Sequence, residues 1–200
     1  TEQYSESNPF QFPTEKGTDV TVVPEKGSIE NNTSGDGGWP ARVTYDKWSD
    51  VEWSGLHIEA LNANDKFKVP YTADKVGKYQ FTVTYRSGNA HNGFVWSEES
   101  GKIADGTATA GSGSSSVTKT ATFNVDVKEA GAGVLVFSGA ANYGAPNTAK
   151  FDVQLLVDKS DLVNAIAAAK EKLTDGNSYT TATTEALQAK IAEATTVKDD

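Results

Sequence analysis

Three polar, glycine-containing segments of the sequence each place an aromatic residue beside carboxylate, amide or imidazole side chains. An exposed aromatic ring stacks on the apolar face of a pyranose, and amides and imidazoles exchange hydrogen bonds with hydroxyl groups. The sequence therefore predicts binding of a hydroxyl-rich ligand such as a sugar. The candidate residues are Trp39 in GDGGWP, Asn89, His91, Asn92 and Trp96 in SGNAHNGFVW, and Asn142, Tyr143 and Asn147 in GAANYGAPN.

The same tryptophans can instead fill a protein core, because large aromatic side chains are usually mostly buried. We favour a core position for Trp48 and Trp53, which lie in strand-like stretches. For Trp39 and Trp96 both interpretations stay open. His91 is either a solvated loop residue or a partner for a hydroxyl group, and His57, which alternates with apolar neighbours, is expected to be structural.

No arrangement typical of catalysis stands out. There is no nucleophile motif, no His/Cys ligand cluster and no Ser-His-Asp setting. Glu52 and Glu59 would have to flank a glycosidic bond at about 5–9 Å to act as a glycosidase pair, and carboxylates on strand faces are usually solvated. We therefore expect that the chain is not an enzyme.

Composition narrows the class of protein. The 200 residues suffice for one core and a small second unit. The net charge of −9 argues against nucleic acids and anionic lipid surfaces as partners. The sequence lacks cysteine, which excludes disulfides and thiolate metal sites, and it has no apolar run long enough to span a membrane. It begins at Thr1 and has no signal peptide, so we expect a piece of a longer protein.

The clearest periodic pattern lies at residues 78–86. Tyr79, Phe81, Val83 and Tyr85 alternate with polar residues, which predicts a central antiparallel strand with one buried face. Residues 104–119 are rich in Gly, Ser, Thr and Ala and are predicted to form a mobile loop. Further strands are predicted at 18–23, 43–45, 51–53, 57–61, 67–71, 120–128, 134–137 and 151–157. Residues 94–96 are a brief strand or a structured loop, and 1–13 are a tail or an edge strand.

The pattern changes near residue 158 to a period of about 3.6. Leu162, Ile166, Ala169 and Leu173 share one helical face, Ser160 is the predicted N-cap, and Gly176 with Asn177 ends the helix. A second helix is predicted from about residue 184. We therefore expect a β domain at 1–157 and a helical module at 158–200, a short and incomplete α-helical hairpin that continues in the parent protein.

The β-rich part resembles the jelly-roll carbohydrate-binding modules of the galactose-binding-like superfamily, especially those related to families 6 and 35. The matching stretches are FKVPYTADKVGKYQFTVTYR at 67–86, residues 123–136, and PNTAKFDVQL at 146–155. The resemblance covers residues 20–157 and implies a mainly β, jelly-roll sandwich. It also implies that the loop after the central strand and the loop before Asn147 border the ligand site, with Asn147 at a common ligand-binding position.

The resemblance further implies a structural calcium ion. The Glu-Ala-Glu pattern of these modules has no clear counterpart here, and only Glu25 and Glu30 stand near the expected place. Glu25 and Asp152 are the candidate calcium ligands, and no other cofactor is expected.

Residues 159–200 resemble a FIVAR module in KSDLVNAIAAAKEKL, in Tyr179-Thr180 and in LQAKIAEATTV, and the match stops before a third helix. Such modules are spacers in surface-attached glycosidases and adhesins of Gram-positive bacteria. The two resemblances together imply a non-catalytic carbohydrate-binding module that targets a large extracellular glycoside hydrolase, secreted or attached to the cell wall. The expected partners are a glycan and the rest of the parent polypeptide, without nucleic acid or membrane. The alternative is a structural spacer or adhesin module that binds no sugar.

Overall fold

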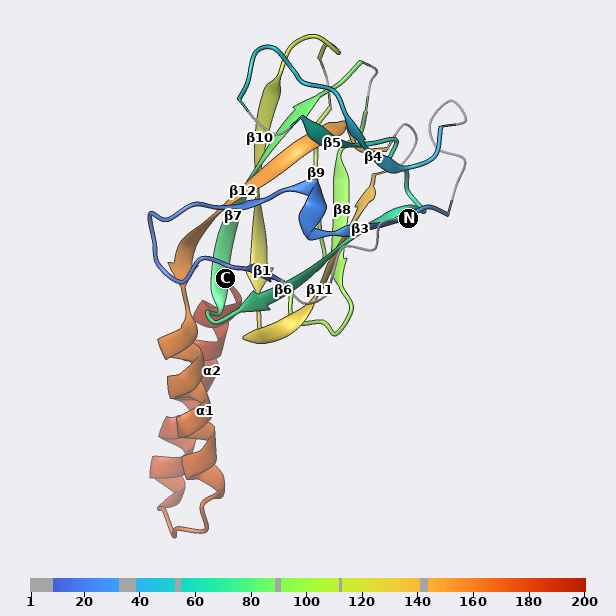
Figure 1. Ribbon diagram of the computed structural model, residues 1–200. Coiled ribbons are helices and arrows are strands. Elements are labelled where there is room, and N and C mark those ends of the chain that lie inside the picture. Colours follow the sequence, from blue (N-terminus) through green and yellow to red (C-terminus); the bar gives the residue numbers. More distant parts are fainter. Residues whose placement is uncertain (1–8, 33–38, 53–54, 89–90, 112, 141–143) are drawn as a thin grey trace.

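The computed structural model describes residues 9–32, 39–52, 55–88, 91–111, 113–140 and 144–200 (Figure 1). Within these residues the strands form two sheets of six, which lie face to face and are followed by two helices. Sheet A contains β1 (Phe10–Gln11), β3 (Ser28–Glu30), β6 (Lys66–Ala73), β8 (Phe94–Glu98), β9 (Gly106–Ala108) and β11 (Gly131–Gly139). Sheet B contains β2 (Val20–Val22), β4 (Arg42–Tyr45), β5 (Leu56–Glu59), β7 (Gly77–Arg86), β10 (Lys119–Val127) and β12 (Asn147–Asp158).

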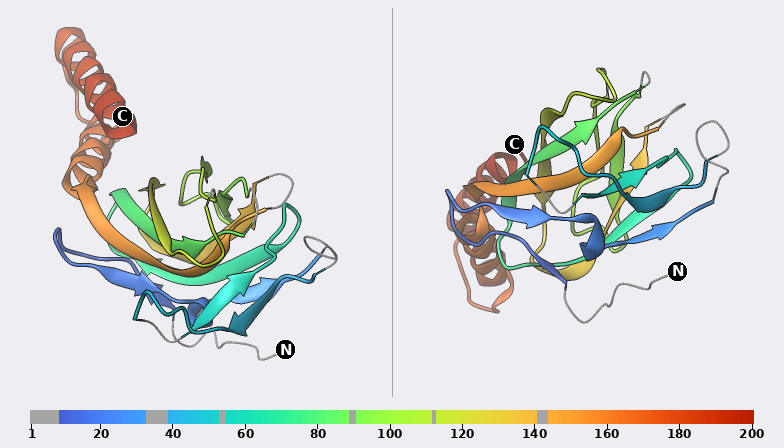
Figure 2. Two further views of the ribbon diagram at one scale, coloured as in Figure 1. Left: turned by 90° about the horizontal axis from the view of Figure 1, so that it is seen from above. Right: turned by 45° about the horizontal axis from the view of Figure 1, so that its top comes forward.

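The order of the strands places β7 and β12 at the centre of sheet B. That sheet runs β10-β7-β12-β5-β4, with β2 beside β12. Sheet A runs β1-β6-β11-β8-β9, with β3 beside β6. A single-turn helix, η1 (Pro24–Lys26), joins β2 to β3. The prediction of a mainly β chain is confirmed, and the two views in Figure 2 show the curved sheets with the helices at one end.

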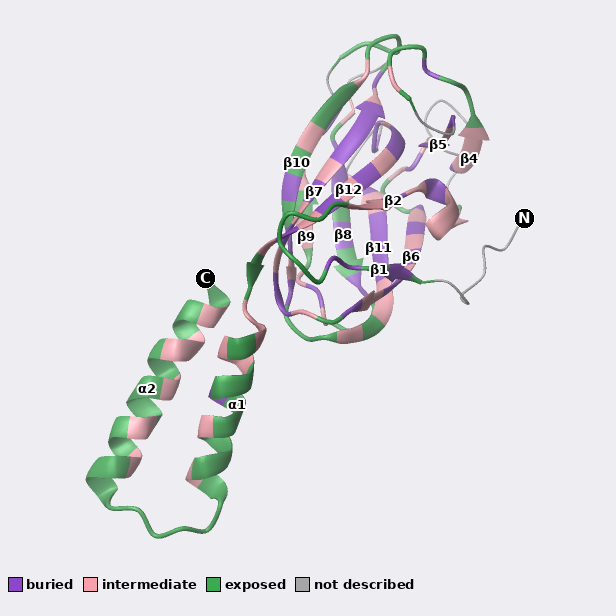
Figure 3. Cartoon of the chain, turned by 60° about the vertical axis from the view of Figure 1, so that its left-hand side comes forward, coloured by how far each residue is buried: buried purple, intermediate pink, exposed green. Residues whose placement is uncertain are grey.

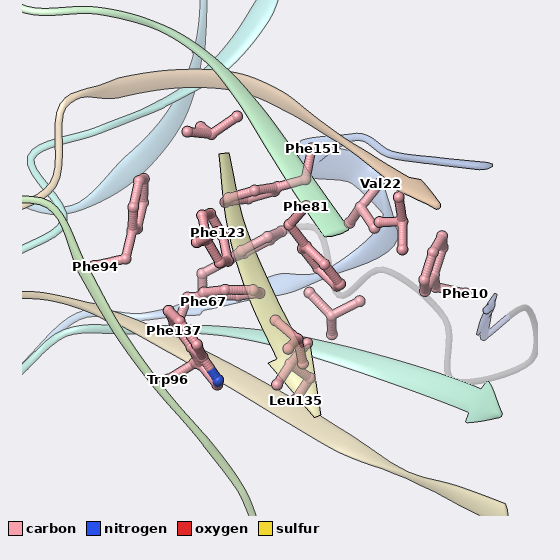
Figure 4. Packing of buried hydrophobic residues seen from close by; sticks show 14 of the residues in the cluster. Phe10, Val22, Phe67, Phe81, Phe94, Trp96, Phe123, Leu135, Phe137 and Phe151 are labelled. Carbon is pink, nitrogen blue, oxygen red and sulfur yellow. The ribbon is translucent and has the colours of Figure 1, made fainter. Parts of the chain in front are cut away.

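The core lies between the two sheets and is rich in phenylalanine. In β7 the alternation is as predicted, because Tyr79, Phe81 and Val83 are fully buried while Gln80 and Thr82 lie on the outer face. Phe137 of sheet A stacks on Phe151 of sheet B with ring centroids 4.8 Å apart. Figure 4 shows these rings packed between the strands. The sheets are therefore held together mainly by burial of aromatic surface.

The glycine-rich segment at 104–119 is not entirely a loop, contrary to the prediction. Residues 106–108 form β9, which pairs with β8. Gly106 lies so close to Trp96 that an added Cβ atom would stand 2.1 Å from Cζ2 of the indole. Ala110 is also buried. Small residues here let the chain pass closely over an aromatic ring, and composition alone does not distinguish this from flexibility.

Two antiparallel helices extend from the sandwich at the end of β12. They are α1 (Ser160–Thr174) and α2 (Thr181–Asp199), and most of their residues are exposed (Figure 3). In α1 the predicted stripe is the covered face, because Ile166 is buried and Leu162, Ala169 and Leu173 are half-buried. Gly176 adopts a positive φ of 78° just after α1. The helical pattern was thus predicted correctly.

The start of α1 differs from the prediction. Ser160 is the first helical residue and not the N-cap, because its amide donates to Oδ1 of Asp158 at 2.9 Å. Its hydroxyl accepts from the Val76 amide at 3.0 Å, and the Lys159 amide donates to the Val76 carbonyl at 2.7 Å. Lys75 forms an ion pair with Asp158 at 3.1 Å. The hairpin is therefore tied to the β6–β7 turn of the sandwich.

Candidate functional site

A polar groove of about 600 Å³ lies on the outer face of sheet B, near the end opposite the helices (top of Figure 1). Its floor follows from strand register, since Thr120 of β10 pairs with Thr84 of β7 and Thr84 pairs with Lys150 of β12. Residues paired in this way present their side chains to the same face of a sheet. The groove is lined by Asp50, Val51, Glu52, Thr84, Thr118, Lys119, Thr120, Ala149 and Lys150.

One wall of the groove is the connection between β4 and β5. It is fastened by Asp50, whose carboxylate accepts from the Thr118 amide at 2.8 Å, from the Thr118 hydroxyl at 2.7 Å and from Arg86 at 2.5 Å. These three donors hold the pKa of Asp50 well below its usual range. The carboxylate therefore stays charged at neutral pH and keeps the wall joined to β7 and to the start of β10.

Trp48 anchors the same connection from the inside. It is 2% exposed and lies under the guanidinium of Arg86, with Cζ 4.9 Å from the ring centre. The centre of the His57 ring lies 5.4 Å from that of Trp48. Trp48 is buried as predicted, but it packs against Arg86 and His57 and is not a member of the hydrophobic cluster between the sheets. His57 is buried and bonded to Glu59, in keeping with the structural role expected of it. Val51 and Glu52 form no strand, and Trp53 lies outside the described residues.

A chain of charged contacts continues from His57 to the edge of the sheet. The His57 Nε2 atom lies 2.8 Å from Oε1 of Glu59, and Oε2 of Glu59 accepts from Arg42 at 2.5 Å. The Arg42 guanidinium in turn lies over the ring of Trp39, with Cζ 5.0 Å from its centre. Trp39 is 62% exposed, so of the two positions that the sequence left open for this residue, core or surface, the surface position is correct.

Trp96 has the opposite environment and is not a binding platform. It is 5% exposed, stacks on Phe123 with centroids 4.8 Å apart, and donates from Nε1 to the Ala104 carbonyl at 3.1 Å. Its strand explains this placement, because Phe94 and Trp96 alternate with the exposed Val95. The interpretation of Trp96 as a ligand-stacking residue is therefore wrong, and the alternative core interpretation holds.

The remaining candidates are distributed along the loops at the same end of the sandwich. Asn147 lies opposite Arg86 in the β12–β7 register, which places it on the groove face beside the Arg86 contacts. Asn92 is exposed and His91 is half-buried, and their amides donate to the carbonyls of Gly144 and Gly111 respectively. Asn89, Asn142 and Tyr143 lie outside the described residues.

Sequence reasoning missed the residues that form the groove. Thr84 and Arg86 were visible as the polar half of the alternating run at 78–86. Asp50 and Thr118 had no local signal, because they contact each other across 68 residues of chain. Only the folded register brings these residues together.

The two candidate calcium ligands, Asp152 and Glu25, have different surroundings. Oδ1 of Asp152 accepts from the Thr21 hydroxyl at 2.6 Å, and Oδ2 pairs with the Lys150 ammonium at 3.0 Å. Calcium takes six to eight oxygen ligands, and no cluster of three or more His or acidic residues suited to a metal occurs among the described residues. One buried carboxylate oxygen of Glu25 has no hydrogen-bond partner among the described residues. The charged partner of Asp152 is thus Lys150, whereas the resemblance implies a metal ion.

Two acidic residues, Glu59 and Glu98, are held by structural partners. Both oxygens of Glu59 are engaged by Arg42 and His57. Glu98 is buried and accepts from the amides of Ser100 and Lys102 at 3.0 and 2.7 Å. Burial raises the pKa of Glu98, but these donors outweigh it and the net shift is downward. Such fully bonded carboxylates are poor general acids or nucleophiles.

No helix within the described ranges is long and apolar enough to cross a membrane.

Comparison with known proteins identifies solved structures with a similar fold. No protein-family model matches the sequence, and no curated protein is similar to it. An exo-beta-1,3-galactanase from Phanerochaete chrysosporium, solved with galactose, has a TM-score of 0.53 at 12% identity; the match covers 68% of this chain and 29% of the galactanase. A family 35 carbohydrate-binding module from Cellvibrio japonicus has a TM-score of 0.50 at 16% identity and covers 68% of this chain and 92% of the module. The β-sandwich therefore has a fold similar to that of carbohydrate-binding modules.

Proposed function

We propose that this chain binds carbohydrate without catalysis, and that the groove on sheet B receives the sugar. The observation that carries the proposal is the row of Thr120, Thr84 and Lys150 on the groove floor, on a fold similar to that of carbohydrate-binding modules. Hydroxyl and ammonium groups exchange hydrogen bonds with sugar hydroxyls. A volume of about 600 Å³ lies within the usual range of ligand pockets and suits one or two sugar rings.

The walls of the groove favour a preformed site. Asp50, Arg86 and Thr118 hold the β4–β5 connection against β7 and β10 before any ligand arrives. A site that needs little reorganisation loses less free energy on binding. Asn147, next to Arg86 in the register, is the resemblance-derived binding residue that the fold brings to this end of the groove. The chain thereby combines residues from β7, β10, β12 and one loop.

The test is a glycan array followed by calorimetry with isosteric variants. Thr84→Val and Thr120→Val remove one hydroxyl each, and each lost hydrogen bond is worth about 0.5–1.5 kcal/mol, or roughly two- to twelvefold in Kd. Thr122→Val is the matched control, because Thr122 lies on β10 and the same face but outside the groove. Equal affinity in all three variants would remove the groove from the proposal.

The parent protein is proposed from the two resemblances. We infer a secreted or wall-attached glycoside hydrolase of a Gram-positive bacterium, in which a jelly-roll module directs the enzyme to its glycan and a FIVAR spacer follows. The helical pair at 160–174 and 181–199 supports the spacer part, as it is mostly exposed and extends from the sandwich (Figure 3). Recovery of the native polypeptide from a culture supernatant, with its full domain content by mass spectrometry, tests this inference.

One observation favours the alternative function of a spacer without sugar binding. The bonds from Val76 to Lys159 and Ser160, with the Lys75–Asp158 ion pair, give the hairpin a defined attachment to the sandwich. A defined attachment suits a protein that holds other domains at a distance. A blank glycan array with a protein shown to be folded by circular dichroism would favour this alternative.

A further inference from the structure

We propose that Trp39 and Arg42 form a second carbohydrate-contact surface, separate from the groove, at the edge strand β4. The inference rests on the proposed function, since it assumes that the ligand is a glycan. The ligand expected there is a pyranose unit whose apolar C–H face stacks on the indole. The surface shares no residue with the groove, since Arg42 belongs to β4 and Trp39 to the segment that precedes it.

The indole is exposed but held in a fixed position. Trp39 is 62% exposed, and the Arg42 guanidinium lies 5.0 Å from its ring centre. The backbone two residues later is anchored, because Ala41 is buried and its amide donates to the side chain of Asn31 at 3.1 Å. A single exposed aromatic residue is common and is no site by itself. An indole fixed between an anchored backbone and a guanidinium is preorganised for stacking.

The guanidinium supplies the polar half of the surface. Glu59 fixes Arg42 through Nη2 at 2.5 Å, and Nη1 donates to the Pro40 carbonyl at 3.2 Å. Arginine has five N–H donors, and these two described contacts involve two of its three nitrogens. The side chain of Arg42 is 35% exposed. Because the guanidinium covers one face of the indole, a sugar stacks on the opposite face, and its hydroxyl groups that extend past the ring meet the remaining N–H donors of Arg42.

The surface is separate from the groove. The groove floor belongs to β10, β7 and β12, whereas β4 lies beyond β5 in the order of sheet B. Adjacent strands are about 4.8 Å apart, so β4 lies roughly 10 Å from β12. The connection that carries Trp48 and Asp50 stands between the two, with Trp48 buried against His57 and Arg86. Two sugar units of one glycan, or of two glycans, can therefore contact the same face.

The experiment uses the whole chain labelled with 5-fluorotryptophan, whose four ¹⁹F resonances are assigned from single Trp→Phe variants. The probe is the best soluble oligosaccharide from the glycan array. The proposal expects a saturable shift of the Trp39 resonance in the wild type and in Thr120→Arg, which places a bulky side chain in the groove. Trp39→Ala should weaken the overall affinity about two- to tenfold, the range for one aromatic stacking contact.

Tyr45→Ala is the matched control, because Tyr45 is 64% exposed on the same strand and packs over Gly55. It should leave the affinity unchanged. Binding with a silent Trp39 resonance would overturn the second surface and leave the groove standing. A Trp39 shift that disappears in Thr120→Arg would show one site sensed from a distance, and would equally overturn it. Failure of every glycan to bind would instead refute the proposed function itself.

Discussion

Replacement of Trp96 distinguishes a core residue from a binding residue most sharply. Its side chain is 5% exposed, stacks on Phe123 and donates to the Ala104 carbonyl, and β9 passes directly over it at Gly106. Trp96→Ala removes the whole indole from this packed site. We therefore expect a loss of stability and not a selective loss of binding.

The magnitude follows from comparable core substitutions. Truncation of a buried tryptophan to alanine costs about 3–5 kcal/mol. In a domain of this size each kcal/mol lowers Tm by about 2–4 °C, so the expected decrease is roughly 6–20 °C. Trp96→Phe keeps a ring but loses the hydrogen bond and some volume, and should cost about 1–3 kcal/mol.

The assay is urea and thermal unfolding followed by near-ultraviolet circular dichroism, with ligand binding measured well below the transition. Val95→Ala serves as the control, because Val95 precedes Trp96 in β8 but points outward and is 38% exposed. That variant should change stability by about 0.5 kcal/mol or less. An unchanged Tm of Trp96→Phe, combined with lost glycan binding, would refute the core assignment. The phenylalanine variant keeps the test valid if the alanine variant does not fold.

Three further predictions concern the network around the groove and the charged groups. Arg86→Met should weaken glycan binding and increase hydrogen exchange in the segment that holds Asp50, because that carboxylate loses its guanidinium partner; unchanged exchange there would contradict the proposed role of the wall. The pKa of Glu98 is lowered in the folded protein, so its stabilising effect is present above the unfolded value of about 4.3 and is lost as the pH falls through the folded value. Glu98→Gln should therefore lower Tm at pH 7 and flatten its decline between about pH 5 and 3, whereas a parallel decline in both proteins would argue against it. Removal of calcium with a chelator should leave Tm unchanged, because Lys150 already neutralises Asp152; a decrease reversed by added calcium would show a metal site.

The local patterns predicted the strands and helices well because they depend on neighbours in sequence. Tyr79 and Phe81 belong to an alternating run that fixes both the strand and its buried face. The same alternation placed Trp96 with Phe94 in β8, and the buried Glu98 completes this inward set. The polar residues around Trp96 suggested that its side chain is exposed, but Trp96 lies on the inward face of β8 and is buried.

The groove lay beyond sequence reasoning for a topological reason. Arg86 contacts Asp50 and Thr118, which lie 36 and 32 residues away in the chain. Such contacts depend on strand order and register, which no local pattern encodes. Residues 106–108 show the same limit, because they pair with β8 and place Gly106 against the indole of Trp96, a contact between segments that composition does not reveal. Trp39 was identified from its residue type, but its pairing with Arg42 required the structure.

The most direct test of the central claim is to map the bound glycan by amide chemical shifts. An isotopically labelled chain would be titrated with the tightest-binding soluble glycan from the array. We predict saturable shifts that cluster at Thr84, Thr120 and Lys150 and extend to Asn147. Shifts confined to sheet A or to the helical pair, with the groove residues unmoved, would contradict the assignment of the groove as the carbohydrate site.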